Sequence, residues 1–147
     1  MPKTILIVDD DTVSRGLIRM VLEYDGCRCL EAENGVSALA MVRQNHVDLM
    51  ILDYMMPGIT GIEVLTALQE PSKPLSPLCP ATIMITGMLQ QSIREKASEL
   101  GAFAVLEKPY DLGQLRSLVF NIHEDMRSSE RKVTPSPSTR TSSSPLS

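Results

Sequence analysis

Apolar residues along the chain form short continuous runs that alternate with helix-spaced patterns. The runs have the length of buried strands and cover residues 4–8, 47–52, 81–85 and 102–106, with 28–31 as a weaker fifth candidate. Apolar residues three or four positions apart predict helices over about 14–24, after 35, after 61, from 93 to a stop at 101, and over 112–126. Five strands, each followed by a helix, predict an α/β fold with a parallel sheet and helices on both faces.

Two segments fall outside this pattern. Residues 70–80 contain four prolines, which exclude a regular helix or a central strand, so we expect an exposed connection there. From Val133 onward the chain is almost entirely Ser, Thr and Pro, a composition that cannot bury enough apolar surface to offset the entropy of ordering. We therefore expect a single domain over 1–126 and a disordered tail over 127–147.

Charge and cysteine content limit the classes of function. The net charge is −4, but the tail carries four basic residues against one glutamate, so its +3 leaves −7 on residues 1–126. An acidic body is a poor candidate for direct nucleic-acid binding. The apolar runs are too short to span a membrane and no signal-peptide pattern opens the chain, so we expect a cytoplasmic protein. The three cysteines lack metal-ligand spacing, and we expect them to be reduced thiols.

Acidic residues follow two of the predicted strands. Asp9, Asp10 and Asp11 come directly after the first, and Asp53 comes after the third. In open α/β sheets ligands bind at the carboxyl ends of the strands, where these residues meet. Clustered carboxylates repel one another unless a cation bridges them, and hard cations take oxygen ligands. The pattern predicts a divalent cation site, most simply Mg²⁺.

Two further polar residues belong to the same edge of the sheet. Thr86 follows the fourth strand and Lys108 follows the fifth. Together with the carboxylates they supply a metal site, a carboxylate free to attack, a hydroxyl donor and a fixed cation. Phosphoryl transfer needs these groups, because charge develops on the oxygens of the transferred group. Each residue alone has an equally good explanation as a cap, a turn residue or a solvated charge. Jointly those explanations are improbable.

At these positions the sequence closely resembles the receiver domain of two-component response regulators, over residues 3–126. The matching stretches are ILIVDDD at 5–11, DYMMPGITG at 53–61, ITG at 85–87 and EKPY at 107–110. The resemblance implies a CheY-like, flavodoxin-like (βα)5 fold, doubly wound around a five-stranded parallel sheet of strand order 2-1-3-4-5.

The resemblance also implies a role for each residue of the edge. Asp53 is the phosphoacceptor, and Asp10 and Asp53 ligate Mg²⁺ directly, joined by the backbone carbonyl of Met55, while Asp9 contributes through water. Lys108 pairs with Asp53 and then with the phosphoryl oxygens, to which the Thr86 hydroxyl also bonds. Asp11 is left out, because it fits the N-cap of the first helix.

The implied partners are proteins. A sensor histidine kinase or histidine phosphotransfer protein is the phosphodonor, and output passes to an unknown protein through the fourth helix, fifth strand and fifth helix. The chain promotes its own phosphorylation and dephosphorylation, and we expect no turnover of an external substrate.

The chain departs from the family pattern at two places. Val105 stands where many receivers carry an aromatic switch residue, so switching through an inward-turning ring is not expected, and Tyr110 is a poor substitute. Met55 and Met88 stand where residues flank the path of the hydrolytic water. Neither can orient that water, which predicts a long-lived aspartyl phosphate.

Three other functions were weighed. A phosphatase of the haloacid-dehalogenase type wants a second Asp two residues after the nucleophile, where this chain has Met55. A flavodoxin-like cofactor binder needs a Ser/Thr-rich phosphate loop after the first strand, where Asp9 to Asp11 would repel a phosphate. A receiver fragment or scaffold that signals without phosphorylation stays as the alternative.

Overall fold

The structure, a computed structural model, describes residues 3–69, 79–88 and 90–133 of the 147-residue chain. Most of the proline-rich connection and residues 134–147 of the predicted tail lie outside the described residues. The chain divides into two units, Met1–Leu112 and Gly113–Ser147, and each is described by itself. Among the helices that the structure describes, none is long and apolar enough to cross a membrane.

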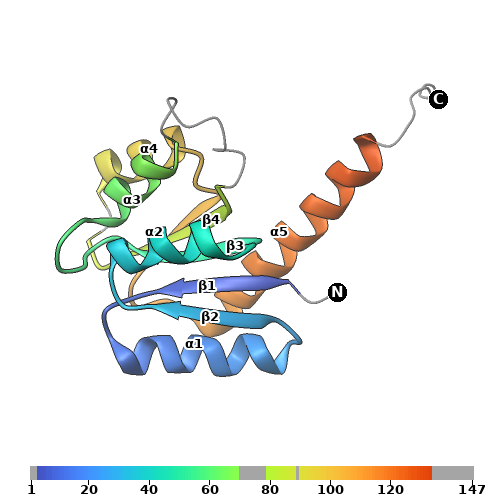
Figure 1. The fold of residues 1–147 in the computed structure, drawn as a ribbon, viewed down its shortest axis with the longest axis horizontal. Coiled ribbons are helices and arrows are strands. Elements are labelled where there is room, and N and C mark those ends of the chain that lie inside the picture. Colours follow the sequence, from blue (N-terminus) through green and yellow to red (C-terminus); the bar gives the residue numbers. More distant parts are fainter. Residues whose placement is uncertain (1–2, 70–78, 89, 134–147) are drawn as a thin grey trace. The chain divides into compact units, whose positions relative to one another are not determined.

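The first unit contains a five-stranded parallel sheet (Figure 1). Its strands are β1 (Thr4–Val8), β2 (Arg28–Ala32), β3 (Leu49–Asp53), β4 (Ala81–Thr86) and β5 (Ala104–Glu107). They pair in the order β2-β1-β3-β4-β5. The helices of this unit are α1 (Thr12–Tyr24), α2 (Gly35–Gln44), α3 (Gly61–Leu68) and α4 (Gln91–Glu99). The arrangement confirms the predicted flavodoxin-like (βα)5 fold with strand order 2-1-3-4-5.

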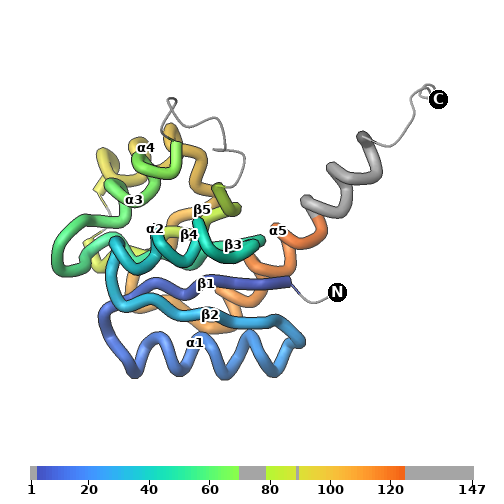
Figure 2. Tube along the Cα trace, viewed as in Figure 1, coloured from blue at the N-terminus to red at the C-terminus, as the bar shows by residue number. Residues whose placement is uncertain are grey.

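Both faces of the sheet are covered, which explains the uninterrupted apolar runs of its strands. Leu6 and Leu52 belong to a buried cluster that includes Ala38 of α2 and Val64 of α3. The alternate residues of β1 point to the opposite face, over which α1 lies (Figures 1 and 2). There Ile18 of α1 is also buried. A sheet buried on both sides fixes its strand ends, and with them the residues that follow.

Polar side-chain caps mark where α1 and α3 begin. The Asp11 carboxylate accepts hydrogen bonds from the backbone N–H of Ser14 at 3.3 Å and from its hydroxyl at 2.7 Å, which confirms Asp11 as the N-cap of α1. Thr60 and Glu63 form a reciprocal capping box at the start of α3. This box ends the loop that follows β3 and so determines the path of residues 54–60.

Strand boundaries differ by one or two residues from the prediction at the third strand. β3 begins at Leu49 instead of 47, because the Asp48 carboxylate accepts a hydrogen bond from the Thr4 backbone N–H at 2.9 Å. It ends on Asp53 itself, whose Cα lies opposite Ile85 of β4. Asp53 is therefore held by the sheet, and it does not belong to a loop.

The second unit contains the helix α5 (Leu112–Val133), which begins at the last residue of the first unit. The helix continues past Met126, where the apolar spacing ends, so residues 127–133 are helical and were wrongly included in the disordered segment. These residues include two arginines, a glutamate and a lysine, which are good helix formers, and no proline. The apolar pattern predicted only the part of the helix that has an apolar face.

Candidate functional site

The carboxyl edge of the sheet brings together residues that follow four different strands. Asp9 comes directly after β1, Asp53 ends β3, Thr86 ends β4, and Lys108 comes directly after β5. The backbone fixes their relative positions: Tyr54 donates to the Ile85 carbonyl at 2.8 Å, and Lys108 donates to the Thr86 carbonyl at 2.8 Å. The predicted edge is thus formed by the register of the sheet.

Three carboxylates converge at this edge. One oxygen from each of Asp9, Asp10 and Asp53 lies within 4.8 Å of the others. Asp9 and Asp53 are buried, with 3% and 4% of their surface exposed, whereas Asp10 is exposed. Three oxygen ligands at this spacing, with one side open to solvent, suit a hard divalent cation that keeps several waters.

Lys108 supplies the fixed cation of the site. Its Nζ lies 3.2 Å from Oδ2 of Asp53 and 3.8 Å from Oδ2 of Asp9. Oδ1 of Asp9 accepts a hydrogen bond from the Asp11 backbone N–H at 2.9 Å. One ammonium therefore stands against three carboxylates, and the cluster keeps an excess of negative charge.

The surroundings at this edge of the sheet raise the pKa of Asp53. The pKa of Asp53 is raised to about 6, chiefly by burial and then by the neighbouring Asp9 carboxylate. The charge and hydrogen bond of Lys108, and a backbone hydrogen bond from Met55, act in the opposite direction. Burial also raises the pKa of Tyr110, with smaller contributions from Asp9 and Asp53, so this phenol lies within the field of the cluster. A buried carboxylate with a perturbed pKa beside a fixed cation is typical of a functional site.

Thr86 is fully buried and lies one residue beyond the partner of Asp53 in β4. Among the described residues its hydroxyl accepts a hydrogen bond from the backbone N–H of Met88 at 3.1 Å and makes no bond to Asp53. The structure thus brings Thr86 to the edge but does not join it to the carboxylates.

The two methionines that were expected to flank the hydrolytic path are largely exposed. Met55 has 59% and Met88 60% of its surface accessible to solvent. Val105 is half-buried in β5. The side chains of both methionines therefore lie on the solvent side of the edge.

Sequence reasoning missed Arg15, which connects α1 to the site. Its Nη1 donates to the backbone carbonyl of Asp9 at 2.6 Å, and its Nε pairs with Glu31 of β2 at 2.8 Å. Its position, one turn into a helix that begins after three acidic residues, was a signal in the sequence that could have identified it. Arg15 holds the backbone at the end of β1.

Gly58, in the loop after β3, and Gly61, the first residue of α3, are needed for two different reasons. Gly58 has a φ of 86°, a conformation that glycine adopts without strain. Gly61 instead packs against β3: a Cβ there would lie 2.8 Å from the backbone oxygen of Asp53. The amide of Gly61 also donates to the Tyr54 carbonyl at 2.9 Å. A side chain at this position would displace the backbone that carries Asp53.

Comparison with known proteins agrees with this geometry. The family described as the response regulator receiver domain matches residues 5–120. The chain belongs to this family. Receiver domains are phosphorylation-controlled modules of two-component signalling systems, and the predicted resemblance is confirmed.

Curated relatives place the same module in proteins of different length. The phosphate regulon transcriptional regulatory protein PhoB of Pseudomonas aeruginosa is 37% identical over 114 residues, which are 77% of this chain and 48% of that protein. The sporulation initiation phosphotransferase F of Bacillus subtilis is 32% identical over 119 residues, which are 81% of this chain and 92% of that protein. The chain thus spans about half the length of the former and most of the latter.

Solved structures share the fold. A CheY-like receiver domain protein from Methanospirillum hungatei is 27% identical with a TM-score of 0.74, and the match covers 90% of this chain and 99% of that one. The response regulator TrrA of Thermotoga maritima, solved in complex with Mg²⁺ and BeF, is 31% identical with a TM-score of 0.68, and the match covers 82% and 98%. The second structure is relevant to the acidic cluster, because it contains a divalent cation.

Proposed function

We propose that Asp53 accepts a phosphoryl group and that this event controls the protein. The observation that carries the proposal is the position of the Asp53 carboxylate, which is buried, 3.2 Å from Lys108 Nζ and part of a cluster of three carboxylates. Asp9 is also buried in this cluster, but it lies farther from Lys108 Nζ, at 3.8 Å, and its Oδ1 already accepts a hydrogen bond from the Asp11 amide.

The transfer step follows from the nature of the donor. A carboxylate oxygen of Asp53 forms a bond to the phosphorus of a phosphohistidine on a kinase or phosphotransfer protein. The bond from phosphorus to the imidazole nitrogen breaks, and its electron pair stays on the partner's histidine. The protein contributes mainly position and charge, since phosphoryl transfer passes through a loose transition state with charge on the equatorial oxygens.

The residues present fit Mg²⁺, which the family and the TrrA complex support. In the proposed set Asp10 and Asp53 are direct ligands with the Met55 backbone carbonyl, and Asp9 acts through a water. The Met55 backbone already lies beside the Asp53 carboxylate, to which it hydrogen-bonds. Bound Mg²⁺ supplies charge that offsets the carboxylates and the incoming phosphoryl oxygens.

Lys108 and Thr86 serve the phosphoryl oxygens. Lys108 pairs with Asp53 before transfer and is close enough to meet the new phosphate afterwards. The Thr86 hydroxyl moves toward Asp53 and donates its O–H to a phosphoryl oxygen; in its present position it accepts a hydrogen bond from the Met88 amide. The loop after β4 changes with it, and Val105 provides no aromatic ring for this change.

The output of the proposed switch is binding to another protein through α4, β5 and α5, and the protein acts in the cytoplasm without turning over external substrates. Residues 1–126 form the receiver. The acidic balance of residues 1–126 and three free cysteines support these assignments.

Incubation with Mg²⁺ and acetyl phosphate tests the proposal, with intact-mass spectrometry as the measurement. Wild type should gain one hydroxylamine-sensitive phosphoryl group, and Asp53→Asn should gain none. Asp11→Asn is the matched control, because it removes a neighbouring carboxylate while asparagine caps α1 equally well. Equal labelling of Asp53→Asn and wild type would show that the acceptor is another residue.

A further inference from the structure

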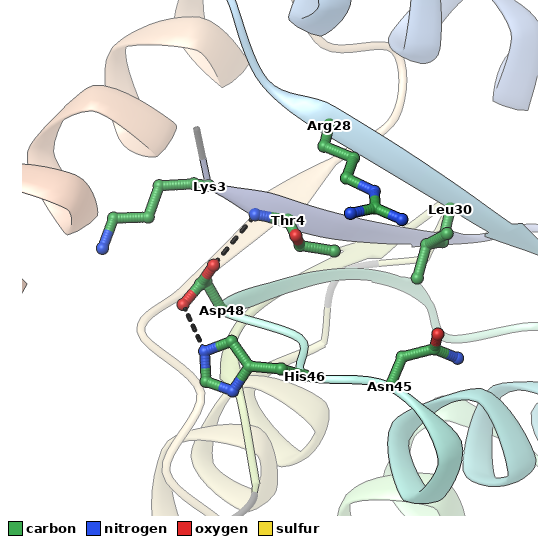
Figure 3. A pocket seen from close by; sticks show the side chains of 7 residues that line it. All are labelled: Lys3, Thr4, Arg28, Leu30, Asn45, His46 and Asp48. Carbon is green, nitrogen blue, oxygen red and sulfur yellow. Dashed lines mark hydrogen bonds and ion pairs between the residues drawn. The ribbon is translucent and has the colours of Figure 1, made fainter. Parts of the chain in front are cut away.

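A second polar site lies at the opposite, amino-terminal edge of the sheet. A cavity of about 500 Å³ opens there beside the starts of β1, β2 and β3 (Figure 3). It is lined by Lys3, Thr4, Arg28, Leu30, Asn45, His46 and Asp48. Proteins commonly bind small molecules in cavities of this size. None of these residues belongs to the phosphoryl-transfer site.

The lining contains one carboxylate, that of Asp48, and it already has hydrogen-bond partners. Asp48 accepts from the Thr4 backbone N–H through Oδ2 at 2.9 Å, and its Oδ1 lies 3.0 Å from Nε2 of His46. Figure 3 shows both bonds within the cavity. Both oxygens of Asp48 thus already have partners, and Asp48 makes no ion pair with Lys3 or Arg28.

The cations of the cavity have no partner among the described residues. Neither the Lys3 ammonium nor the Arg28 guanidinium makes a salt bridge or a side-chain hydrogen bond in the part of the chain that the structure describes, and the same holds for the Thr4 hydroxyl. The two cations lie on either side of Thr4 (Figure 3). Three groups of donors, two of them charged, thus face solvent at one cavity of a body that is otherwise strongly acidic.

We propose that this cavity binds a small organic phosphate of about mononucleotide size. The guanidinium of Arg28 presents a planar fork of donors that matches phosphate oxygens, and arginine is preferred over lysine for such recognition. Leu30 adds an apolar wall for the organic part of the ligand. A bare polyanion such as a nucleic acid is disfavoured, because residues 1–126 carry a net charge of −7 around two unpaired cations.

Titration with AMP, followed by amide chemical shifts, tests the proposal on the full chain. EDTA is present and Mg²⁺ is absent, so that the acidic edge repels the phosphate. AMP should shift the amides of Thr4, Arg28 and Asp48 saturably at millimolar concentrations, whereas adenosine should not. Shifts at Asp53 in place of these, the same affinity for adenosine, or no saturation would overturn the proposal.

Charge-neutral variants separate the site from general ionic attraction. Arg28→Gln should weaken AMP binding by about tenfold, since hydrogen bonds to charged groups contribute at least that much. Lys3→Gln removes the second cation of the lining and should weaken it severalfold. Arg94→Gln removes an equally exposed arginine from α4 and should change it by less than about twofold. Equal losses in Arg28→Gln and Arg94→Gln would refute a site at the amino-terminal edge.

Discussion

Removing the charge of Asp53 should stabilise the metal-free protein at neutral pH. The carboxyl has a pKa of about 6 in the folded protein against an ordinary value of 3.8, chiefly because it is buried and then because it faces Asp9. The folded state therefore binds more protons than the unfolded state between these values, and stability falls as pH rises through this window. Above the folded pKa the whole penalty is present.

The size of the effect follows from the two pKa values. A difference of about 2 pK units corresponds to about 3 kcal/mol at pH 7.5, and to about 1 kcal/mol at pH 4.5, where the folded carboxyl is mostly protonated. Asp53→Asn keeps the shape of the side chain and removes its charge. The variant should exceed wild type in free energy of unfolding by about 3 kcal/mol at the higher pH and by about 1 kcal/mol at the lower.

Urea denaturation in EDTA at both pH values measures this difference. Asp11→Asn is the matched control and should show no such gain, because hydrogen bonds from Ser14 lower the pKa of Asp11, whose charged form is therefore favourable. Saturating Mg²⁺ should stabilise wild type and reduce the advantage of Asp53→Asn. Equal stability of wild type and Asp53→Asn at pH 7.5 in EDTA would refute the electrostatic strain inferred from burial and Asp9.

Three further variants test the geometry around Asp53. Gly61→Ala should lower the free energy of unfolding by roughly 1–3 kcal/mol and slow phosphorylation, since its Cβ would lie 2.8 Å from the Asp53 backbone oxygen; an unchanged melting temperature would contradict the close approach. Mg²⁺ should raise the melting temperature of wild type but not of Asp10→Asn, and an identical shift in both would exclude Asp10 as a ligand. Met55→Asn combined with Met88→Glu should hydrolyse the aspartyl phosphate about ten to a hundred times faster than wild type in Mg²⁺ buffer; an unchanged or slower rate would remove the argument that these methionines protect it.

The residues of the acidic edge could be predicted because each follows an apolar run. A strand buried on both faces has an easily recognised end, and parallel strands bring such ends to one edge whatever their side-chain orientation. Asp9, Asp53 and Lys108 meet for this reason. Thr86 meets the same edge, but its hydroxyl bond to the Met88 amide depends on the loop after β4, which no periodicity predicts.

Other features depended on packing that the pattern does not contain. The sequence position of Arg15 hints at a role, but its partners, Glu31 and the Asp9 carbonyl, become known only when α1 is placed against β2. The amino-terminal cavity draws its lining from three separate strand starts, and Arg28 lies in the weakest of the predicted strands. Sequence patterns give the order of elements well, whereas contacts between residues distant along the chain require the register of the sheet.

The surrounding backbone holds two members of the carboxylate cluster, Asp9 and Asp53, in place. The Asp11 amide donates to Asp9 Oδ1, Arg15 donates to the Asp9 carbonyl, and the β3–β4 pairing holds Asp53. The backbone around Asp9 and Asp53 therefore fixes where these two carboxylates lie relative to each other. In the proposed function, Mg²⁺ would meet ligands that the fold already holds close together, and its charge would offset that of the carboxylates and of the phosphoryl oxygens at Asp53.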